Sequence, residues 1–251
     1  MNKPIALITG ATSGIGKATA EVLANDYRLI ICGRRADRLA ELSDQLKSTT
    51  KILTLSFDVR DQATVESLLS NLPDEWKDIS VLINNAGNAH GLGLIHEGDI
   101  ADWDAMIDIN VKGLLYVSRQ IIPNMVKAKK GHIINIGSIA GIDVYPRGNV
   151  YNASKHAVDA ISKGMRQDLN PYGIKVSEIK PGLVNTEFSE VRFKGDQSKA
   201  SKVYQGFDPL TARDIAETIA FILSRPAHVN IADLLILPTA QATSTMVDKK
   251  S

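Results

Sequence analysis

The sequence predicts a single α/β domain with a doubly wound fold, in which helices cover both faces of a parallel sheet of about seven strands. Two observations predict it. Seven short apolar runs alternate with stretches of helical periodicity, as in parallel strands joined by crossover helices. No linker or internal repeat is evident, so residues 1–251 are expected to form one domain. The apolar runs are residues 5–8, 29–32, 52–57, 81–83, 133–136, 176–179 and 234–237.

The first apolar run leads into a glycine-rich turn that opens a helical pattern. The turn reads Gly10-Ala11-Thr12-Ser13-Gly14-Ile15-Gly16. Glycines at such a turn let the backbone approach a pyrophosphate, whose charge the first amides of the helix stabilise. The spacing is Gly-x-x-x-Gly-x-Gly, and by itself the motif is equally compatible with an ordinary turn.

The second apolar run ends in Gly33-Arg34-Arg35. In an NAD-binding fold an acidic residue at this place holds the ribose hydroxyls. Two guanidinium groups instead suit a phosphate, through paired charged hydrogen bonds, which predicts NADP(H) rather than NAD(H). The alternative is a solvated pair of arginines that begins the next helix.

Proton chemistry is predicted by Tyr151 and Lys155, which lie one helical turn apart. The helix that carries them has apolar positions at spacings of three and four and stops at Asn170-Pro171. An ammonium near a phenol favours the phenolate, so we expect the pKa of Tyr151 to be lowered towards neutrality. As an isolated pair, the two residues are more typical of an exposed helix face than of a catalytic site, and the other motifs of the chain reverse this expectation.

Further motifs occur in a fixed order along the chain: Asp58-Val59, Asn84-Asn85-Ala86-Gly87, Asn110, Ser138 and Pro181-Gly182. With them the sequence resembles the short-chain dehydrogenase/reductase superfamily over nearly its full length. The resemblance implies a Rossmann-type NADP-binding catalytic domain. The cofactor-binding residues are then expected to be Gly10, Thr12, Ser13, Gly14, Ile15, Gly16, Arg34, Arg35, Asp58, Val59, Asn85, Ala86, Gly87, Tyr151, Lys155, Pro181, Gly182, Val184 and Thr186.

The resemblance also implies the catalytic roles. Ser138 would hold the substrate oxygen, and Tyr151 would be the general acid or base. Lys155 would bind the nicotinamide ribose and lower the phenol pKa, while Asn110 would hold a water that passes protons to Lys155. The resemblance further implies a homotetramer, built through the helix around residues 103–127 and the catalytic helix.

Several segments, among them residues 72–76, 136–141, 181–184 and 186–196, resemble the NADP-dependent 3-hydroxy acid dehydrogenases in particular. That group acts on serine, allo-threonine and similar acids, its members also reduce malonic semialdehyde, and its relatives reduce sulfoacetaldehyde. The resemblance therefore implies a small anionic alcohol or carbonyl substrate. A sulfoacetaldehyde reductase, a 3-oxoacyl reductase and a non-catalytic cofactor-sensing protein are the alternatives.

An anionic substrate is also suggested by the segment of residues 186–208, which is long for a plain connector and is expected to cover the site. Arg192 in this segment and Arg147 before the catalytic helix are candidates to bind the substrate together with Ser138 and Tyr151. Each arginine could equally be solvated. At Asn88-Ala89-His90-Gly91 the chain departs from the superfamily, and His90 either changes the polarity of the pocket or faces water.

Other classes of partner have little support. The formal net charge is +1, from 29 basic and 28 acidic residues, which does not favour nucleic acid. No apolar run approaches the ~20 residues that span a bilayer, and residues 1–4 lead to the first strand without a signal sequence, so a cytoplasmic protein is expected. The five histidines lack metal-ligand spacing, so no metal is expected, and the single cysteine, Cys32, is expected to be buried.

Overall fold

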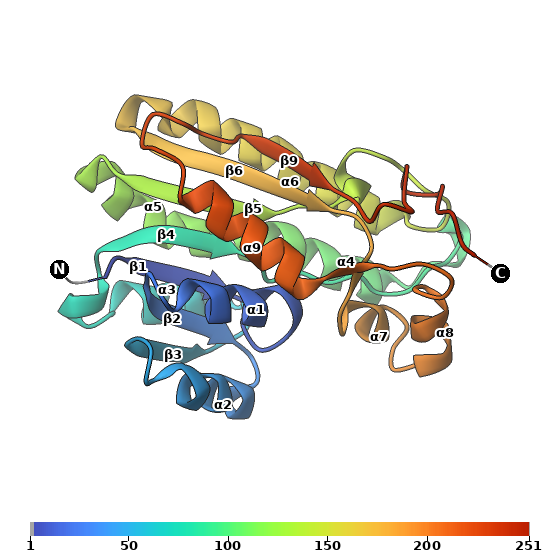
Figure 1. Cartoon of the computed structure of the whole chain (residues 1–251), viewed down its shortest axis with the longest axis horizontal. Helices are drawn as coiled ribbons and strands as arrows, with labels where there is room; N and C mark the ends of the chain where they lie inside the picture. Colours follow the sequence, from blue (N-terminus) through green and yellow to red (C-terminus); the bar gives the residue numbers. More distant parts are fainter. Residues whose placement is uncertain (1–2, 251) are drawn as a thin grey trace.

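Seven parallel strands form the central sheet of the computed structural model, which describes residues 3–250 (Figure 1). The order across the sheet is β3-β2-β1-β4-β5-β6-β9. The strands are β1 (Ile5–Thr9), β2 (Arg28–Gly33), β3 (Ile52–Ser56), β4 (Ile79–Asn84), β5 (Gly131–Ile136), β6 (Ile174–Pro181) and β9 (Asp233–Ile236). Each apolar run named above lies in one of them, except that Phe57 and Leu237 follow the ends of β3 and β9, and the doubly wound fold is confirmed. The expectation of direct entry into the first strand involves Met1 and Asn2, which lie outside the described residues.

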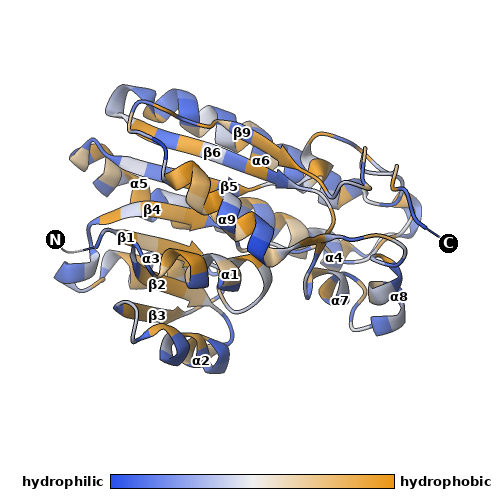
Figure 2. Ribbon diagram, in the orientation of Figure 1, coloured by the Kyte–Doolittle hydropathy of each residue, from blue (hydrophilic) through white to orange (hydrophobic). Residues whose placement is uncertain are grey.

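Helices cover both faces of the sheet. One face carries α1 (Gly14–Leu23), α2 (Ala36–Leu46) and α9 (Ala212–Leu223), and the other carries α3 (Gln62–Ser70), α5 (Leu114–Ala128) and α6 (Asn149–Leu169), with α4 (Ile100–Ile107) packed against α6. A hydrophobic core fills the space on each face, and the strands contribute alternate side chains to the two cores. Figure 2 shows β1, β2 and β3 as largely apolar, whereas α2 beside them carries hydrophilic as well as apolar residues. Cys32 is buried, as predicted.

The strand order reverses between β1 and β4, which lie side by side although β2 and β3 intervene in the sequence. The connections that leave these two strands run to opposite faces of the sheet, so a crevice opens at their carboxyl ends. The strand arrows in Figure 1 point to this edge, where α7 and α8 also lie. The topology therefore brings the loops after β1, β2, β4, β5 and β6 together at one place.

The segment of residues 186–208 has more structure than the expected loop. It contains the short helices α7 (Phe188–Arg192) and α8 (Gln197–Lys202). Its two ends are joined by a small parallel sheet, in which β7 (Val184–Asn185) pairs with β8 (Leu210–Thr211). The segment therefore leaves and re-enters the domain at neighbouring points and lies as one unit over the carboxyl edge of the main sheet.

The predicted helix around residues 103–127 is interrupted by a wide turn. Residues Asp108–Gly113 form a π-helix, η3, between α4 and α5, and Asn110 lies within it. Short 3-10 turns occur at η1 (Asp74–Trp76), η2 (Ile95–Glu97), η4 (Ile139–Gly141) and η5 (Asn170–Tyr172). Across residues 3–250, no helix combines the length and the apolar character needed to cross a membrane.

Candidate active site

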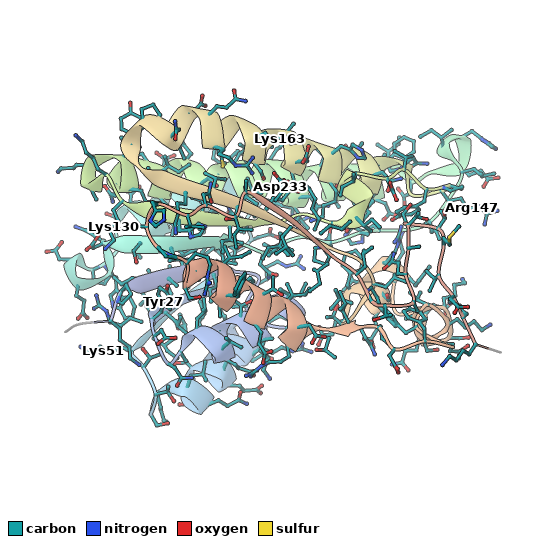
Figure 3. All side chains as sticks on the ribbon, turned by 45° about the horizontal axis from the view of Figure 1, so that its top comes forward. Tyr27, Lys51, Lys130, Arg147, Lys163 and Asp233 are labelled. Carbon is teal, nitrogen blue, oxygen red and sulfur yellow. The ribbon has the colours of Figure 1, made fainter. Side chains whose placement is uncertain are left out.

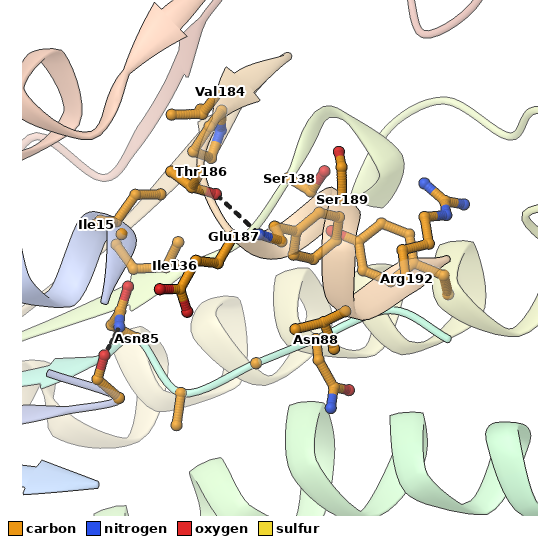
Figure 4. A pocket seen from close by; sticks show the side chains of 18 of the residues that line it. Ile15, Asn85, Asn88, Ile136, Ser138, Val184, Thr186, Glu187, Ser189 and Arg192 are labelled. Carbon is orange, nitrogen blue, oxygen red and sulfur yellow. Dashed lines mark hydrogen bonds between the residues drawn. The ribbon is translucent and has the colours of Figure 1, made fainter. Parts of the chain in front are cut away.

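A cavity of about 530 Å³ lies at the carboxyl edge of the sheet (Figure 4). Its walls come from the glycine turn, from the loops after β2, β3, β4 and β5, and from α6. The segment of residues 186–208, which we call the covering segment, closes the remaining side. Of the predicted site residues, all line this cavity except Gly16, Asn110 and Arg147. The structure thus brings together residues that are spread over most of the sequence.

The glycine turn has the backbone that a bound phosphate needs. Gly10 and Gly14 have φ values of 66° and 50°, in the left-handed region that other residues avoid. Ser13 precedes α1 with an extended backbone and forms no side-chain cap, and the first turn of α1 carries no acidic residue. The first amides of α1 are therefore open to an anion at the positive end of the helix.

Gly16 has a packing role rather than a lining role. A Cβ atom at this position would overlap the backbone carbonyl of Gly10. The Asn85 side chain, which follows β4, fills the remaining space and donates hydrogen bonds to the carbonyls of Thr9 and Gly10 at 2.9 and 3.1 Å. Asn85 therefore fixes the turn after β1 against the end of β4.

Arg35 lies beside the glycine turn. It donates hydrogen bonds to Thr12 Oγ1 at 3.0 Å and to Ser13 Oγ at 2.9 Å, and it also binds Glu187 of the covering segment at 3.0 Å. Arg38, one turn into α2, donates to the same carboxylate at 2.6 Å. Two half-buried guanidinium groups next to the turn, with no acidic residue at the end of β2, suit the extra phosphate of NADP(H).

Asp58, at the predicted adenine position, is held by two neighbouring arginines. Arg60 donates from Nε to Oδ1 of Asp58 at 3.1 Å and from its terminal guanidinium nitrogen to Oδ2 at 2.7 Å, and Arg34 lies 3.8 Å away. Burial acts to raise the pKa of Asp58, but these hydrogen bonds and charges hold it below its ordinary value. Asp58 is therefore ionised near neutral pH, and Arg34, which is exposed, is directed towards this side of the cavity.

Ser138, Tyr151 and Lys155 lie together at the inner end of the cavity, each less than 10% exposed. Ser138 follows β5 and precedes the turn η4, and its Oγ accepts a hydrogen bond from the amide of Ala140 at 3.1 Å. Tyr151 and Lys155 lie on the first turns of α6. Lys155 donates from Nζ to the carbonyl of Ile136 at 2.8 Å, which ties α6 to β5.

The pKa of Tyr151 differs from the expectation. Burial raises the pKa of this phenol above its ordinary value, while hydrogen bonding with Ser138 and the charge of Arg192 act to lower it. Burial also lowers the pKa of Lys155 to about 8, against the opposing effect of Glu178. The prediction that the ammonium lowers the phenol pKa is wrong as a net effect, because desolvation is larger and Lys155 is directed at Ile136.

Asn110 lies behind the cavity wall, and three hydrogen bonds hold its side chain. Its side chain accepts from the Asn88 amide and donates to the Asn88 carbonyl, both at 2.8 Å, and it also donates to Ser154 at 2.9 Å. A Cβ at Gly87 would lie 3.1 Å from Asn110 Oδ1 and 3.6 Å from Lys155 Nζ. The absence of a side chain at Gly87 therefore leaves one small space that both residues reach, which suits the predicted water.

The two candidate arginines have different positions. Arg192 lies in the cavity, with its guanidinium 5.4 Å from the ring of Tyr151 and 5.5 Å from that of Tyr145, and it donates to the Tyr145 hydroxyl at 2.8 Å. Arg147 is exposed, has a φ of 66°, and lines a smaller neighbouring cavity that Tyr151 and Arg192 also reach. Figure 3 places it at the outer edge of the molecule.

His90 is half-buried rather than facing water. Its Nε2 lies 2.8 Å from Asn88 Nδ2, burial lowers its pKa, and it lines the smaller cavity. The Asn88 side chain points away from Ser138 and Arg192 (Figure 4). Asn88 therefore lines the main cavity with its side chain turned away from these two residues, and His90 lies in the neighbouring cavity.

The sequence analysis missed Tyr145, Arg38, Glu187 and Phe188. Tyr145 supports Arg192, and the ring of Phe188 packs 5.7 Å from that of Tyr151. Tyr145 stands two residues before Arg147, so an aromatic residue within the same motif was the available signal. The Arg38–Glu187 contact joins residues 149 positions apart and had no local signal.

Comparison with known proteins agrees with this geometry. A family model described as short chain dehydrogenase matches residues 4–197. The NADP-dependent 3-hydroxy acid dehydrogenase YdfG of Escherichia coli (strain K12) is 46% identical over 240 residues, which cover 95% of this chain and 96% of the relative. Sulfoacetaldehyde reductase 2 of Chromohalobacter salexigens is 41% identical over 242 residues, 96% of each chain.

A solved structure described as the closed form of serine dehydrogenase complexed with NADP+ superimposes with a TM-score of 0.92. It is 44% identical, and the match covers 98% of this chain and 100% of the other. The structural similarity therefore extends over the sheet, the helices and the covering segment alike.

Proposed function

Because the chain belongs to the short-chain dehydrogenase family and is an NADP-dependent oxidoreductase, we propose that it acts on short 3-hydroxy acids or the corresponding small anionic aldehydes and ketones. Serine, allo-threonine and malonic semialdehyde represent this class. The relatives are named as acting on 3-hydroxy acids, serine and sulfoacetaldehyde, which supports the same class.

The position of Arg192 is the observation that carries the proposal. Its guanidinium stands next to the Tyr151 ring, which brings a fixed cation close to the proton donor. A substrate whose oxygen lies at Tyr151 and Ser138 would place an anionic group one or two bonds further on within reach of Arg192. Guanidinium groups bind carboxylates and sulfonates through paired hydrogen bonds, which orients the substrate as well as holding it.

Each residue of the site has a separate role in reduction of the carbonyl group. NADPH, when bound, supplies the hydride. Ser138 donates a hydrogen bond to the carbonyl oxygen, and Tyr151 gives it a proton as its negative charge develops. Lys155, as the ammonium, stabilises the phenolate that remains and holds the nicotinamide ribose, and Asn110 supports the path by which Tyr151 and Lys155 regain a proton.

A sulfonated substrate is the second candidate, because sulfoacetaldehyde reductase 2 is 41% identical over nearly the whole chain. A sulfonate is a tetrahedral trioxygen group and a carboxylate is planar, so the room around Arg192 would decide between them. A rate of NADPH oxidation, measured with malonic semialdehyde, sulfoacetaldehyde and an acetoacetyl thioester, distinguishes the candidates. Turnover of the thioester alone would favour a 3-oxoacyl reductase, and no turnover of any would favour a cofactor-sensing protein.

The proposal itself is tested by Arg192→Ala. We expect KM for the anionic aldehyde to rise by about 10-fold or more, the effect of losing a charged hydrogen bond, while an uncharged aldehyde of similar size is little affected. Arg147→Ala is the matched control, because that arginine lines the neighbouring cavity. Equal losses with charged and uncharged aldehydes would contradict a role for Arg192 in binding the anionic group, and activity that survives Tyr151→Phe would contradict the mechanism.

The homotetramer stays a prediction that rests on resemblance, and the cytoplasmic location stays a prediction from the sequence. Light scattering on the purified protein tests the tetramer through the mass in solution, since one chain has a mass of 27.2 kDa. Fractionation of the source cells tests the location.

A further inference from the structure

Glu178, on β6, is a buried acid next to the catalytic residues to which the reaction described above assigns no role. Its relative exposure is 0%, and neither carboxylate oxygen has a hydrogen-bond partner among the described residues. It faces α6, on the same side of the sheet as Val176. A buried carboxylate without hydrogen bonds is costly, so its position calls for a physical explanation.

The Glu178 side chain lies directly against the strand end that carries Ser138. A Cβ on Gly137, the residue before Ser138, would overlap the Glu178 carboxylate. Gly137 in turn donates its amide to the carbonyl of Ile179 at 2.8 Å. The lack of a side chain at Gly137 therefore makes room for an acid beneath the catalytic serine.

Lys180, also on β6, supplies the counter-charge. Its Nζ lies 3.3 Å from Glu178, 2.8 Å from Asp159 of α6 and 2.6 Å from Asp233 of β9. The ammonium occupies the middle of this carboxylate cluster, so the cluster already holds its cation. Figure 3 shows Asp233 and Lys163 on the side formed by α6 and β9, where Lys163 and Arg166 balance the outer acids.

Lys155 donates from Nζ to the carbonyl of Ile136 at 2.8 Å. The next residue, Gly137, lies directly against the Glu178 carboxylate, so the ammonium and this acid flank the same strand end. Burial lowers the pKa of Lys155 to about 8, and the charge of Glu178 acts against this change. Burial raises the pKa of Glu178 to about 7, against the charge of Lys180. The charges of Asp233 and Asp159 affect the pKa values of Glu178 and Lys180. The pKa of Lys155 responds to the charge of Glu178 instead.

We propose that Glu178 is a positioning residue for the reaction, which keeps Lys155 charged at the site while Lys180 holds the Glu178 carboxylate under Gly137 and Ser138. The other acids of the cluster serve mainly to hold Lys180. The inference depends on turnover by the proposed chemistry but not on which of the small acids is the substrate.

The test is the pH profile of kcat/KM for Glu178→Gln, which keeps the shape of the side chain and removes its charge. Loss of this negative charge lowers the pKa of Lys155, so the alkaline limb is expected to move down by about half a pH unit or more. Glu178→Asp, which retains the charge, is expected to keep the limb near that of the wild type. Glu178→Ser serves as a second neutral variant if Glu178→Gln does not fold, as judged by circular dichroism.

Asp233→Asn is the matched control, because it also removes a carboxylate that binds Lys180. Its alkaline limb is expected to match that of the wild type. An unchanged limb in the neutral Glu178 variants, or an equal shift in Asp233→Asn, would overturn the proposal. A wild-type protein that turns over none of the small aldehydes would instead overturn the proposed function, so the two failures are distinct.

Discussion

The carboxylate of Glu187 accepts hydrogen bonds from Arg35 at 3.0 Å and from Arg38 at 2.6 Å. Glu187 begins the covering segment, and Arg35 also binds the glycine turn. One ion-pair cluster therefore connects the lid of the cavity to the residues expected to hold the extra phosphate of NADP(H). A phosphate that binds Arg35 has to share this guanidinium with Glu187 or displace it.

Glu187→Gln is expected to tighten NADPH binding by about threefold, because the neutral amide competes less well for Arg35 and the pairs are partly exposed. NADH lacks the phosphate, so its affinity should stay the same. Titration of cofactor fluorescence measures both constants. Weaker NADPH binding in this variant would mean that Glu187 orients the arginines rather than competing for them.

Arg34→Ala combined with Arg35→Ala is expected to lower the preference for NADPH over NADH by about 10-fold or more, through loss of charged hydrogen bonds to the phosphate. The ratio of kcat/KM for the two cofactors measures the effect. Arg213→Ala is the control, because Arg213 is an exposed arginine on α9 that pairs with Glu217. An unchanged ratio in the double variant would rule out these arginines as the source of the cofactor preference.

His132 is expected to make the protein acid-sensitive. It is buried on β5, with Nε2 2.8 Å from Ser177 Oγ, and burial together with the charge of Lys175 lowers its pKa to about 3. The unfolded chain takes up this proton below about pH 6.5, whereas the folded protein resists it, so stability falls as the pH falls from 6.5 towards 3. At pH 5 the loss from this residue is about 2 kcal/mol.

Urea unfolding at pH 7 and pH 5 checks this expectation. The free energy of unfolding of the wild type should fall by about 2 kcal/mol more than that of His132→Gln. His96→Gln, which changes an exposed histidine on η2, should behave as the wild type does. Equal pH dependence in the wild type and His132→Gln would show that the folded protein protonates His132 readily.

The strands and the motif residues could be predicted because their signals are local. Apolar runs mark the strands, and the residues that line the cavity follow those strands at short distances, so a parallel sheet places them at one edge. Arg147 and Arg192 had equal support in the sequence as substrate-binding residues. Only the fold shows that Arg147 is exposed and that Arg192 packs against Tyr151. The pKa of Tyr151 was unpredictable for the same reason, since its sign depends on burial.

The wide turn η3 lets α4 pack against Tyr151 while Asn110 faces Gly87, two orientations that a regular helix would not combine. On its N-terminal side, α4 packs Met106 and Trp103 against Tyr151, and within the turn Asn110 faces Gly87. Each residue of an α-helix advances by about 100°, so one residue fewer here would rotate α4 by that angle relative to α5. The length of the stretch between Met106 and α5 is therefore constrained as strictly as the identity of its residues. A single deletion there would turn away either the α4 side chains that pack against Tyr151 or the side-chain amide of Asn110.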